Sequence, residues 1–541
     1  MTNKLISLVI IMLILSIGRS YSDNQFLFPK EKPSIFKKII KNEDQDYSSN
    51  LPQKKPIINL KENPKKEEIQ KNELDIKEKK EVKRVEPIKK KSSFVFPQKK
   101  PSIYKLKTET AEKSSILNQK DFARAKETIE FIKNKKWNSA LKSSAKVKDR
   151  EFRNLITWMH LKTSRNGASF AEYKKFIEQN EDYPRINRIR YLAEEKIYLR
   201  NNSPTSIINW FEKYPPLGGL GKIKLAEAYL EQGQNDKVSK LIKDGWETAE
   251  IRKNDLGYYR AKFKKFIDAD DHVKRADYLA WERKYWDLKR MLKYLPTDQK
   301  ALYNARQILM SNSYGVDNAI SKVPQYLREN PGLEFDRLRW RNRRGRLEGS
   351  LEILYKNSNK TERQMIRPDL WWEQRKSVAR SLIYKKRYKT AYKISSEHSL
   401  SSGPSFAEAE WLSGWIALSF LNSAEYAIDH FENFYNNVGY PISLARGAYW
   451  LGAAYKEIGN QERAKKYFTE GAKFPMTYYG QLSFNEISPG ENFELIDQSN
   501  FDKDYEKVFR KNRLIKHVIL LKELDSTKYS KDILKHLATL N

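Results

Sequence analysis

A helical period of apolar residues, which begins near residue 118 and continues towards the end of the chain, is the strongest constraint on the fold. Apolar side chains recur every three or four positions, as in AEAYLEQGQNDKVSKLI (226–242) and ARSLIYKKRYKTAYKI (379–394). No stretch alternates polar and apolar residues over the length of a strand, and Gly and Pro lie between the periodic segments. The pattern predicts an all-α protein in which residues 118–541 form helices joined by loops.

The segment 441–475 indicates how these helices pair. Small residues occur where two helices must approach each other, and aromatic residues occur where they must fill the space between them. The preceding unit repeats part of this arrangement as Ala427 and Phe431. A helix pair of this kind cannot bury its apolar face alone, so we expect the pairs to stack into an open, curved solenoid. The offsets fit the tetratricopeptide pattern L-G-x2-Y…A-x3-F…P, with Ala448 in place of the usual Trp, at Leu451, Gly452, Tyr455, Ala464, Phe468 and Pro475.

The chain is strongly basic: 103 Lys and Arg residues against 69 Asp and Glu residues give a formal net charge of +34. Such a charge favours anionic partners, namely nucleic acid, anionic lipid or a carboxylate-bearing polymer. The alternative is that the lysines simply cover the polar faces of the helices. No cysteine is present, and the six histidines lack the spacing of metal ligands, so we expect no disulfide, no metal and no cofactor.

The N-terminus has the pattern of a secretory signal peptide over residues 1–22. Lys4 precedes an apolar run at 5–17, and Ser20 and Ser22 supply the small residues of a cleavage site. The run is short for a membrane span, although a retained anchor is the alternative. We therefore expect a mature chain that works outside the cytoplasm, has no stable membrane span and does not bind nucleic acid.

Residues 23–117 have the composition of a basic, disordered linker, rich in Lys and Pro and poor in aromatic residues. Within it, FLFPKEKPSIFKK (26–38) returns as FVFPQKKPSIYKLK (94–107), and LPQKKPIINLK (51–61) is a degenerate third copy. The motif F-x-F-P-x-x-K-P-S-I favours an extended segment whose aromatic side chains could dock in a groove. The repeated motif is either a tether to a partner or a duplication without a role, and the sequence does not decide between them.

Four aromatic-rich stretches of the helical region resemble the superhelical, U-shaped domain of the soluble lytic murein transglycosylases, in particular the alphaproteobacterial type. They are RADYLAWERKYWDLKRML (275–292), LEFDRLRWRNRRGRLEGSLEIL (333–354), SFAEAEWLSGWIALSFLN (405–422) and PISLARGAYWLGAAY (441–455). KFPMTYYGQLSF (473–484) is similar to the Y-P-T-x-Y-Y-G-Q-L-A segment that closes this domain in the family, and PPLGGLGKIKLAEAYL (215–230) matches a loop and helix typical of it. The similarity covers about residues 118–541.

The resemblance implies a periplasmic protein that processes peptidoglycan. The family cleaves the bond between N-acetylmuramic acid and N-acetylglucosamine without water and leaves a 1,6-anhydro end. One glutamate, in a lysozyme-like domain with an E-S…G-L-M-Q motif, acts as acid and then as base. This sequence contains no such motif, so no catalytic residue carries over. We expect the chain itself to be the non-catalytic body that embraces glycan strands, with a separate catalytic domain or another periplasmic protein as a further partner.

Other chemistries have little support in the sequence. Glu408 and Glu410 are two positions apart on a predicted helix and splay to different faces, so they do not form an acid–base pair. LGGLGK (217–222) resembles a phosphate-binding loop, but Pro216 and Ile223 replace a required Gly and a required Ser or Thr. The alternative function is a periplasmic helical-repeat scaffold that binds other proteins.

The segment 474–484 supplies the first candidates for glycan binding. Tyr478 and Tyr479 offer flat faces suited to sugar rings, and Gln481 can hydrogen-bond hydroxyl groups or the backbone. Gly480 suits a turn that ends the helical arc. The alternative is that both tyrosines simply pack the junction.

The arginine-rich segment 337–346 supplies the second group of candidates. Arg339 and Arg343 could hold carboxylates of stem peptides in bidentate fashion, and Trp340 could stack on a sugar face. The arginines of this segment are spread around the helix, so some of them must face solvent or pair with Glu.

An apolar stripe marks the predicted last helix. Ile533, Leu534, Leu537 and Leu540 share one face of this helix, and no polar capping unit follows them in the sequence. We expect part of the stripe to stay exposed and to mediate self-association, unless it packs inward on the preceding helices. Replacing Leu537 and Leu540 with Asp would then give a monomer without unfolding the chain.

Overall fold

The computed structural model describes residues 111–311, 314–491 and 509–539. The predicted signal peptide (1–22) and the predicted linker up to residue 110 lie outside the described residues, and so does Leu540.

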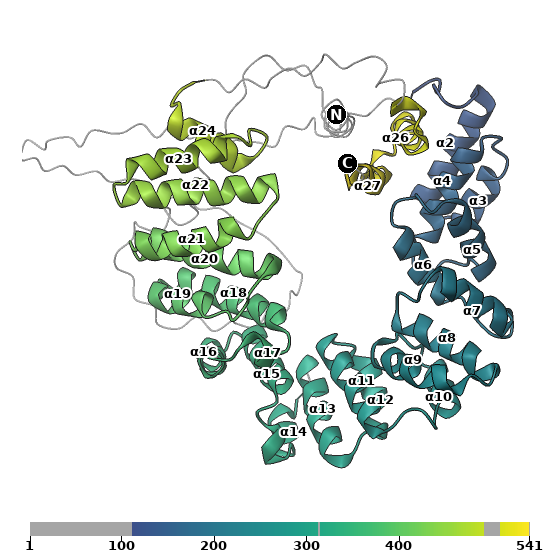
Figure 1. The fold of residues 1–541 in the computed structure, drawn as a ribbon, viewed down its shortest axis with the longest axis horizontal. Coiled ribbons are helices and arrows are strands. Elements are labelled where there is room, and N and C mark those ends of the chain that lie inside the picture. The colour runs from purple at the N-terminus through teal and green to yellow at the C-terminus, as the bar shows by residue number, and fades with distance from the viewer. Residues whose placement is uncertain (1–110, 312–313, 492–508, 540–541) are drawn as a thin grey trace, which may run out of the picture. The chain divides into compact units, whose positions relative to one another are not determined.

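The described residues form helices and no β-strand, so the all-α prediction is confirmed for this part of the chain (Figure 1). None of the described helices is both long and apolar enough to cross a membrane. The first helices are α2 (Gln119–Lys133), α3 (Trp137–Ser144), α4 (Arg150–Leu161), α5 (Phe170–Gln179), α6 (Ile186–Glu194), α7 (Pro204–Lys213), α8 (Gly219–Glu231), α9 (Asn235–Thr248), α10 (Asp255–Lys262), α11 (Ala269–Trp281), α12 (Tyr285–Met291), η2 (Leu292–Tyr294) and α13 (Thr297–Met310). The later helices are α14 (Val316–Ser321), η3 (Gln325–Leu327), α15 (Pro331–Arg343), α16 (Leu347–Lys356), α17 (Glu362–Met365), α18 (Pro368–Tyr384), α19 (Tyr388–Ser396), α20 (Gly403–Phe420), α21 (Ala424–Asn436), α22 (Pro441–Glu457), α23 (Gln461–Ala472), α24 (Tyr478–Ile487), α26 (Arg513–Glu523), η4 (Thr527–Tyr529) and α27 (Lys531–Thr539).

Local sequence explains where many helices begin. Ser169 and Glu172 form a reciprocal capping box at the start of α5, in which each side chain accepts a hydrogen bond from the backbone of the other. Pro368 and Pro441 occupy the first positions of α18 and α22, where the missing N–H costs nothing.

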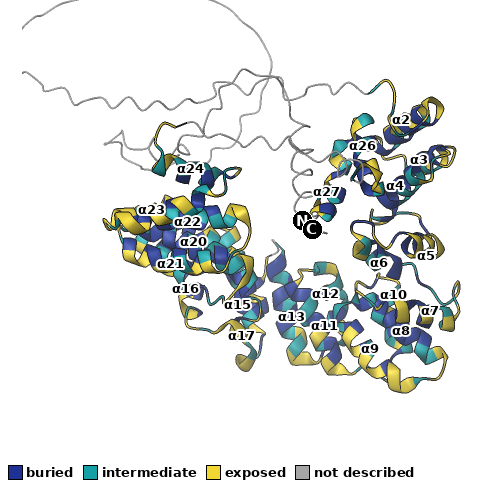
Figure 2. Cartoon of the chain, turned by 45° about the horizontal axis from the view of Figure 1, so that its top comes forward, coloured by how far each residue is buried: buried dark blue, intermediate teal, exposed yellow. Residues whose placement is uncertain are grey.

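Consecutive helices pack side by side, most extensively α8 with α9, α20 with α21, and α22 with α23. Alternate helices also touch: α20 packs against α22, and α22 packs against α24. Most helices therefore turn one side towards their neighbours and leave the other side exposed (Figure 2). This stacking of pairs is the arrangement that the sequence period predicts.

Two glycines illustrate how closely neighbouring helices approach. A Cβ on Gly452 would lie 2.7 Å from the ring of Phe468, and a Cβ on Gly414 would lie 2.7 Å from the ring of Phe431. Both distances are too short for any larger residue, because real carbon atoms do not approach so closely. The predicted packing of Phe468 against Gly452 is confirmed.

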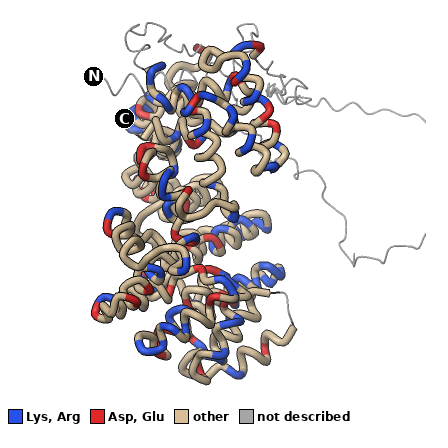
Figure 3. Tube along the Cα trace, turned by 90° about the vertical axis from the view of Figure 1, so that its right-hand side faces the viewer, with Lys and Arg blue, Asp and Glu red and all other residues tan. Residues whose placement is uncertain are grey.

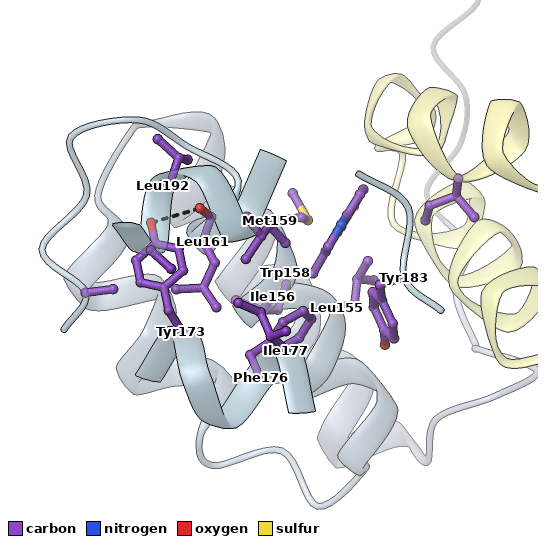
Figure 4. Close-up of a cluster of buried hydrophobic side chains, with 14 of the residues drawn as sticks. Leu155, Ile156, Trp158, Met159, Leu161, Tyr173, Phe176, Ile177, Tyr183 and Leu192 are labelled. Carbon is purple, nitrogen blue, oxygen red and sulfur yellow. Dashed lines mark hydrogen bonds between the residues drawn. The ribbon is translucent and has the colours of Figure 1, made fainter. Parts of the chain in front are cut away.

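The N-terminal helices enclose a core rich in aromatic residues (Figure 4). Trp158 is fully buried, and its indole N–H donates a hydrogen bond to Pro184 O over 2.8 Å. Tyr173 is also buried, and its hydroxyl donates to Leu161 O over 3.0 Å. Both polar groups are thus satisfied by backbone carbonyls inside the core, as buried donors require.

The C-terminal helices α26 and α27 complete this same core, beside α4 (Figure 1). His517 Nε2 of α26 lies 2.7 Å from the hydroxyl oxygen of Tyr183. Asp532 of α27 forms ion pairs with Lys162 at 3.0 Å and with Arg185 at 2.9 Å. Segments far apart in sequence therefore share one hydrophobic core.

This packing contradicts the expectation of an exposed C-terminal stripe. Ile533 and Leu537 are buried in the N-terminal core, and Leu534 is half-buried against it. The expectation was wrong for these residues because α27 does not end a stack of helices. It packs against helices from the other end of the chain, which cover its apolar face.

Basic residues are spread along the described helices and are interspersed with acidic ones (Figure 3). Many of them form ion pairs with acidic residues of neighbouring helices. Lys262, for example, lies 2.7 Å from Glu231, and Lys356 lies 2.7 Å from Glu334. Over the described helices this distribution fits lysines that cover polar helix faces.

Candidate functional site

The Tyr-Tyr-Gly-Gln segment begins a helix instead of ending one. Tyr478 is the first residue of α24, and the Thr477 side chain caps this helix by accepting a hydrogen bond from Gly480 N over 3.0 Å. A Cβ at position 480 would collide with Phe474 O, so glycine is required there by close backbone approach. Gly480 therefore does not take the helix-ending conformation that the sequence suggested; it lies in the first turn of α24 and admits the close approach of the preceding turn.

Gln481 stabilises the same turn. Its side-chain Nε2 donates a hydrogen bond to Pro475 O over 3.0 Å. The amide nitrogen is thus committed to the backbone, which is one of the two roles that the sequence suggested for this residue.

Tyr478 and Tyr479 are half-buried and belong to a larger group of aromatic side chains on α20, α22 and α24. Tyr479 lies 5.5 Å from Tyr449 and 6.5 Å from Trp450, between ring centroids. We call this group the aromatic surface; its members, all half-buried, are Trp411, Trp415, Tyr449, Trp450, Tyr478 and Tyr479.

The tryptophans of the aromatic surface come from two helices. Trp411 and Trp415 are one turn apart on α20, and their rings stack with centroids 5.8 Å apart and planes 7° apart. Trp450 of α22 meets Trp411 edge-on at 6.1 Å. Sequence reasoning missed these residues, although their i, i+4 spacing was a signal that both rings of α20 share one face.

Arg446 brings a positive charge to the aromatic surface. Its guanidinium lies 3.4 Å from the ring centroid of Trp411 and 6.0 Å from that of Tyr479. Burial lowers the pKa of Arg446. Arg446 Nε, Trp411 Nε1 and Trp450 Nε1 are buried beneath this surface and have no acceptor within the described residues. The half-buried rings and the guanidinium of Arg446 match a ligand that has both apolar faces and hydrogen-bonding groups.

The arginine-rich candidates lie elsewhere. They are on α15, which packs on α11, α13, α16 and α18, whereas α24 packs on α22 and α23. Arg343 donates hydrogen bonds to Leu309 O over 2.6 Å and to Met310 O over 3.2 Å. Leu309 and Met310 are the last two residues of α13, so Arg343 caps the C-terminus of this helix.

Arg339 and Trp340 are also held by neighbours. Arg339 is half-buried, and burial together with the charges of Arg283 and Arg343 lowers its pKa to about 10. The guanidinium groups of Arg344 and Arg346 lie over the Trp340 ring at 4.5 and 4.8 Å. The ring of Trp340 is thus already stacked by cations, and we favour the aromatic surface as the candidate site.

Glu410 is a buried carboxylate between two histidines. His398 Nε2 lies 2.9 Å and His430 Nδ1 lies 2.7 Å from its two oxygens. Despite burial, these two hydrogen bonds lower the pKa of Glu410 to about 2. Glu408 instead accepts hydrogen bonds from Trp372 Nε1 and Lys376 Nζ. Despite burial, the hydrogen bonds from Lys376 and Trp372 also lower the pKa of Glu408, so neither carboxyl group has the raised pKa that a general acid needs. Within the described part of the chain, no group of three or more potential ligands could hold a metal ion.

The glycine-rich loop at 217–222 binds a carboxylate of the protein itself. Glu194 of α6 is buried and accepts hydrogen bonds from Leu217 N over 2.5 Å and from Gly218 N over 3.0 Å. A Cβ on Gly221 would lie 2.5 Å from the Glu194 carboxyl carbon. The loop therefore has the anion-binding geometry of backbone N–H groups, but Glu194 fills it, which excludes a phosphate. Burial raises the pKa of Glu194 to about 7.

These observations define an all-α protein of stacked helices with a half-buried aromatic surface. No protein-family model matches the sequence, and no curated protein matches it either. Solved structures do match. The 70 kDa soluble lytic transglycosylase from Escherichia coli is similar to this chain with a TM-score of 0.44 and 13% sequence identity. A complex of the 70 kDa soluble lytic transglycosylase with bulgecin A is similar with a TM-score of 0.44 and 14% identity. Each match covers 77% of this chain and 65% of the solved chain, so this chain spans about two thirds of their length.

Proposed function

We propose that this chain is the peptidoglycan-binding, non-catalytic body of a protein of the lytic transglycosylase type, and that it holds murein glycan strands in the periplasm. The observation that carries the proposal is the position of Tyr478 and Tyr479. They lie in the segment that resembles the family's closing motif, and in space they extend the aromatic surface of Trp411 and Trp450. The sequence resemblance and this geometry therefore point to the same residues.

The aromatic surface suits the chemistry of a glycan strand. A pyranose ring has C–H groups that pack against aromatic faces and hydroxyl groups that need hydrogen-bond partners. The guanidinium of Arg446, which lies beside the rings of Trp411 and Tyr479, brings hydrogen-bond donors to this surface. The positive charge of Arg446 also favours the carboxylates that accompany peptidoglycan glycans.

Binding, and not cleavage, is the role that we assign to these residues. Glycosidic cleavage needs a carboxylic acid with a raised pKa that can reach the leaving oxygen. Glu194 has a raised pKa, but its carboxyl oxygens are occupied by the loop at 217–222. We expect the purified chain to release no 1,6-anhydro muropeptides from sacculi, and release above a boiled control would contradict this assignment.

Co-sedimentation with purified sacculi tests the proposal against the scaffold alternative. The chain lacking residues 1–22 should pellet with sacculi and remain in solution without them. A scaffold for other proteins would stay in the supernatant and instead pull a defined protein from a periplasmic extract. Sedimentation at low salt that vanishes at moderate salt would indicate only charge attraction by this strongly basic chain, and would contradict a built glycan site.

A further inference from the structure

A pocket of 620 Å³ lies between α8, α10 and the loop at 198–200, on helices that do not carry the aromatic surface. Three tyrosines, Tyr198, Tyr258 and Tyr259, contribute to its walls, and Lys224 of α8 lines it. The size falls in the range of pockets for small organic ligands. No residue of this pocket takes part in the proposed glycan site.

Lys224 has an unusual environment for a lysine. The residue is only 3% exposed, and its ammonium lies 4.3 Å from the ring centroid of Tyr198 and 5.3 Å from that of Tyr259. Within the described residues, Nζ has neither a hydrogen-bond acceptor nor an ion-pair partner. The residue as a whole is buried, so water reaches few of the three N–H donors of its ammonium. Burial accordingly lowers the pKa of Lys224.

The carboxylates beside Lys224 do not satisfy it. Glu227 is buried, accepts a hydrogen bond from the Tyr258 hydroxyl over 2.5 Å and pairs with Lys262 at 3.3 Å. Arg252 and other basic residues add positive charge around the pocket; its lining contains four cations (Arg200, Lys224, Arg252 and Lys253) and two carboxylates (Glu227 and Asp255). The pocket is therefore net positive, and Lys224, which Glu227 and Asp255 attract without forming an ion pair, is the only buried cation of its lining.

We propose that this pocket binds a carboxylate, specifically the C-terminal carboxylate of a short peptide. One carboxylate oxygen accepts a hydrogen bond from Lys224 Nζ, and the body of the peptide lies against the rings of Tyr198 and Tyr259. Phosphate carries negative charge but has no body that lies against the tyrosine rings. Free small acids share the carboxylate but lack the body that covers the tyrosines.

Isothermal titration calorimetry on the purified chain tests the proposal with four probes. These are N-acetyl-alanyl-alanine, its C-terminal amide, acetate and inorganic phosphate. We expect the free peptide acid to bind with a Kd of about 1 mM or tighter and the amide to bind at least about 10-fold more weakly, because the amide removes the charge-assisted hydrogen bond. Equal binding of acid and amide, tighter binding of acetate or phosphate, or no binding of the peptide acid would overturn the proposal.

Two lysine substitutions distinguish binding in the pocket from non-specific attraction by the positive charge of the chain. Lys224→Met keeps the buried stem and removes the ammonium, so it should weaken peptide binding about 10-fold or more. Lys237→Met is the matched control, because Lys237 also lies over a tyrosine ring, that of Tyr229 at 4.9 Å, but is exposed and outside the pocket. It should leave binding unchanged. Undiminished binding by folded Lys224→Met would refute the assignment.

An exposed residue of the pocket keeps the test decisive if Lys224→Met fails to fold. Arg252→Ala should leave the melting temperature unchanged and weaken binding about threefold, because an exposed charge contributes less than a buried one. No change in affinity would count against the pocket. The proposed glycan site is tested separately by substitutions on α24, so either proposal can fail without the other.

Discussion

Loss of the Asp336 carboxylate should destabilise the middle of the chain strongly. Arg306 of α13 is fully buried, with its Nε 2.8 Å from Asp336 of α15 and its Nη1 2.7 Å from Asp277 of α11. The guanidinium thus joins three alternate helices of the stack. Asp336→Leu leaves Arg306 with one partner, and removing one partner from a buried ion pair costs about 3–5 kcal/mol.

Asp277 provides a matched control for this prediction. Its side chain is 35% exposed, whereas that of Asp336 is 4% exposed, so water can replace much of what Asp277→Leu removes. We expect Asp277→Leu to cost about 1 kcal/mol. The double variant Arg306→Met with Asp336→Leu removes the buried charge altogether and should recover at least about 2 kcal/mol relative to Asp336→Leu alone.

Urea denaturation followed by circular dichroism measures these differences. Helical-repeat chains can unfold in sections, so the transition of the variant is compared with that of the unmutated chain across the whole urea range. If Asp277→Leu and Asp336→Leu cost the same, or if the effects of Arg306→Met and Asp336→Leu are additive, the reasoning about the buried charge is refuted.

Two further predictions concern the C-terminal helix and the buried acid. Leu537→Asp should lower the free energy of unfolding by more than about 3 kcal/mol, since Leu537 is 4% exposed within the N-terminal core; a variant that keeps its melting temperature would contradict the packing of α27. The pKa of Glu410 in the folded chain is lowered from 4.5 to about 2. The contribution of this carboxylate to the free energy of unfolding is therefore present above pH 4.5 and is lost as the pH falls towards 2. The unmutated chain should therefore lose about 3 kcal/mol more than Glu410→Gln over that interval, and parallel pH profiles of stability for the two chains would contradict this.

Local sequence patterns were sufficient to predict the helices and how neighbouring pairs meet. The period of apolar residues defines each helix, and the contact between Gly452 and Phe468 joins two helices that follow one another in the chain. Such contacts leave a signal because both partners lie within one repeat.

Contacts between segments that are far apart in the chain leave no such pattern in the local sequence. The return of α27 to the core of α4 depends on residues that are hundreds of positions apart, such as Lys162 and Asp532. The same limit applies to Glu410, whose two histidines come from the loop before α20 and from α21. Their spacing matches no motif, because the fold and not the local sequence brings them together.

The candidate site was predicted only in part. Tyr478 and Tyr479 were found through their resemblance to a family motif, but Trp411, Trp450 and Arg446 join them only in space. Arg343 illustrates the opposite error, because an arginine that could bind a carboxylate in fact caps α13. Which acceptor an arginine reaches depends on the helix that packs against it.

Binding of soluble glycan strands to the chain tests the central claim most directly. Calorimetric titration should show binding by the unmutated chain, and a variant with Tyr478→Ala and Tyr479→Ala should bind about 10-fold or more weakly. Tyr384→Ala is the control, because Tyr384 is 72% exposed at the end of α18 and is not part of the aromatic surface. Circular dichroism should show the same helix content for all three chains. If the unmutated chain does not bind, or if the double variant binds as tightly as Tyr384→Ala, the aromatic surface is not a glycan-binding site.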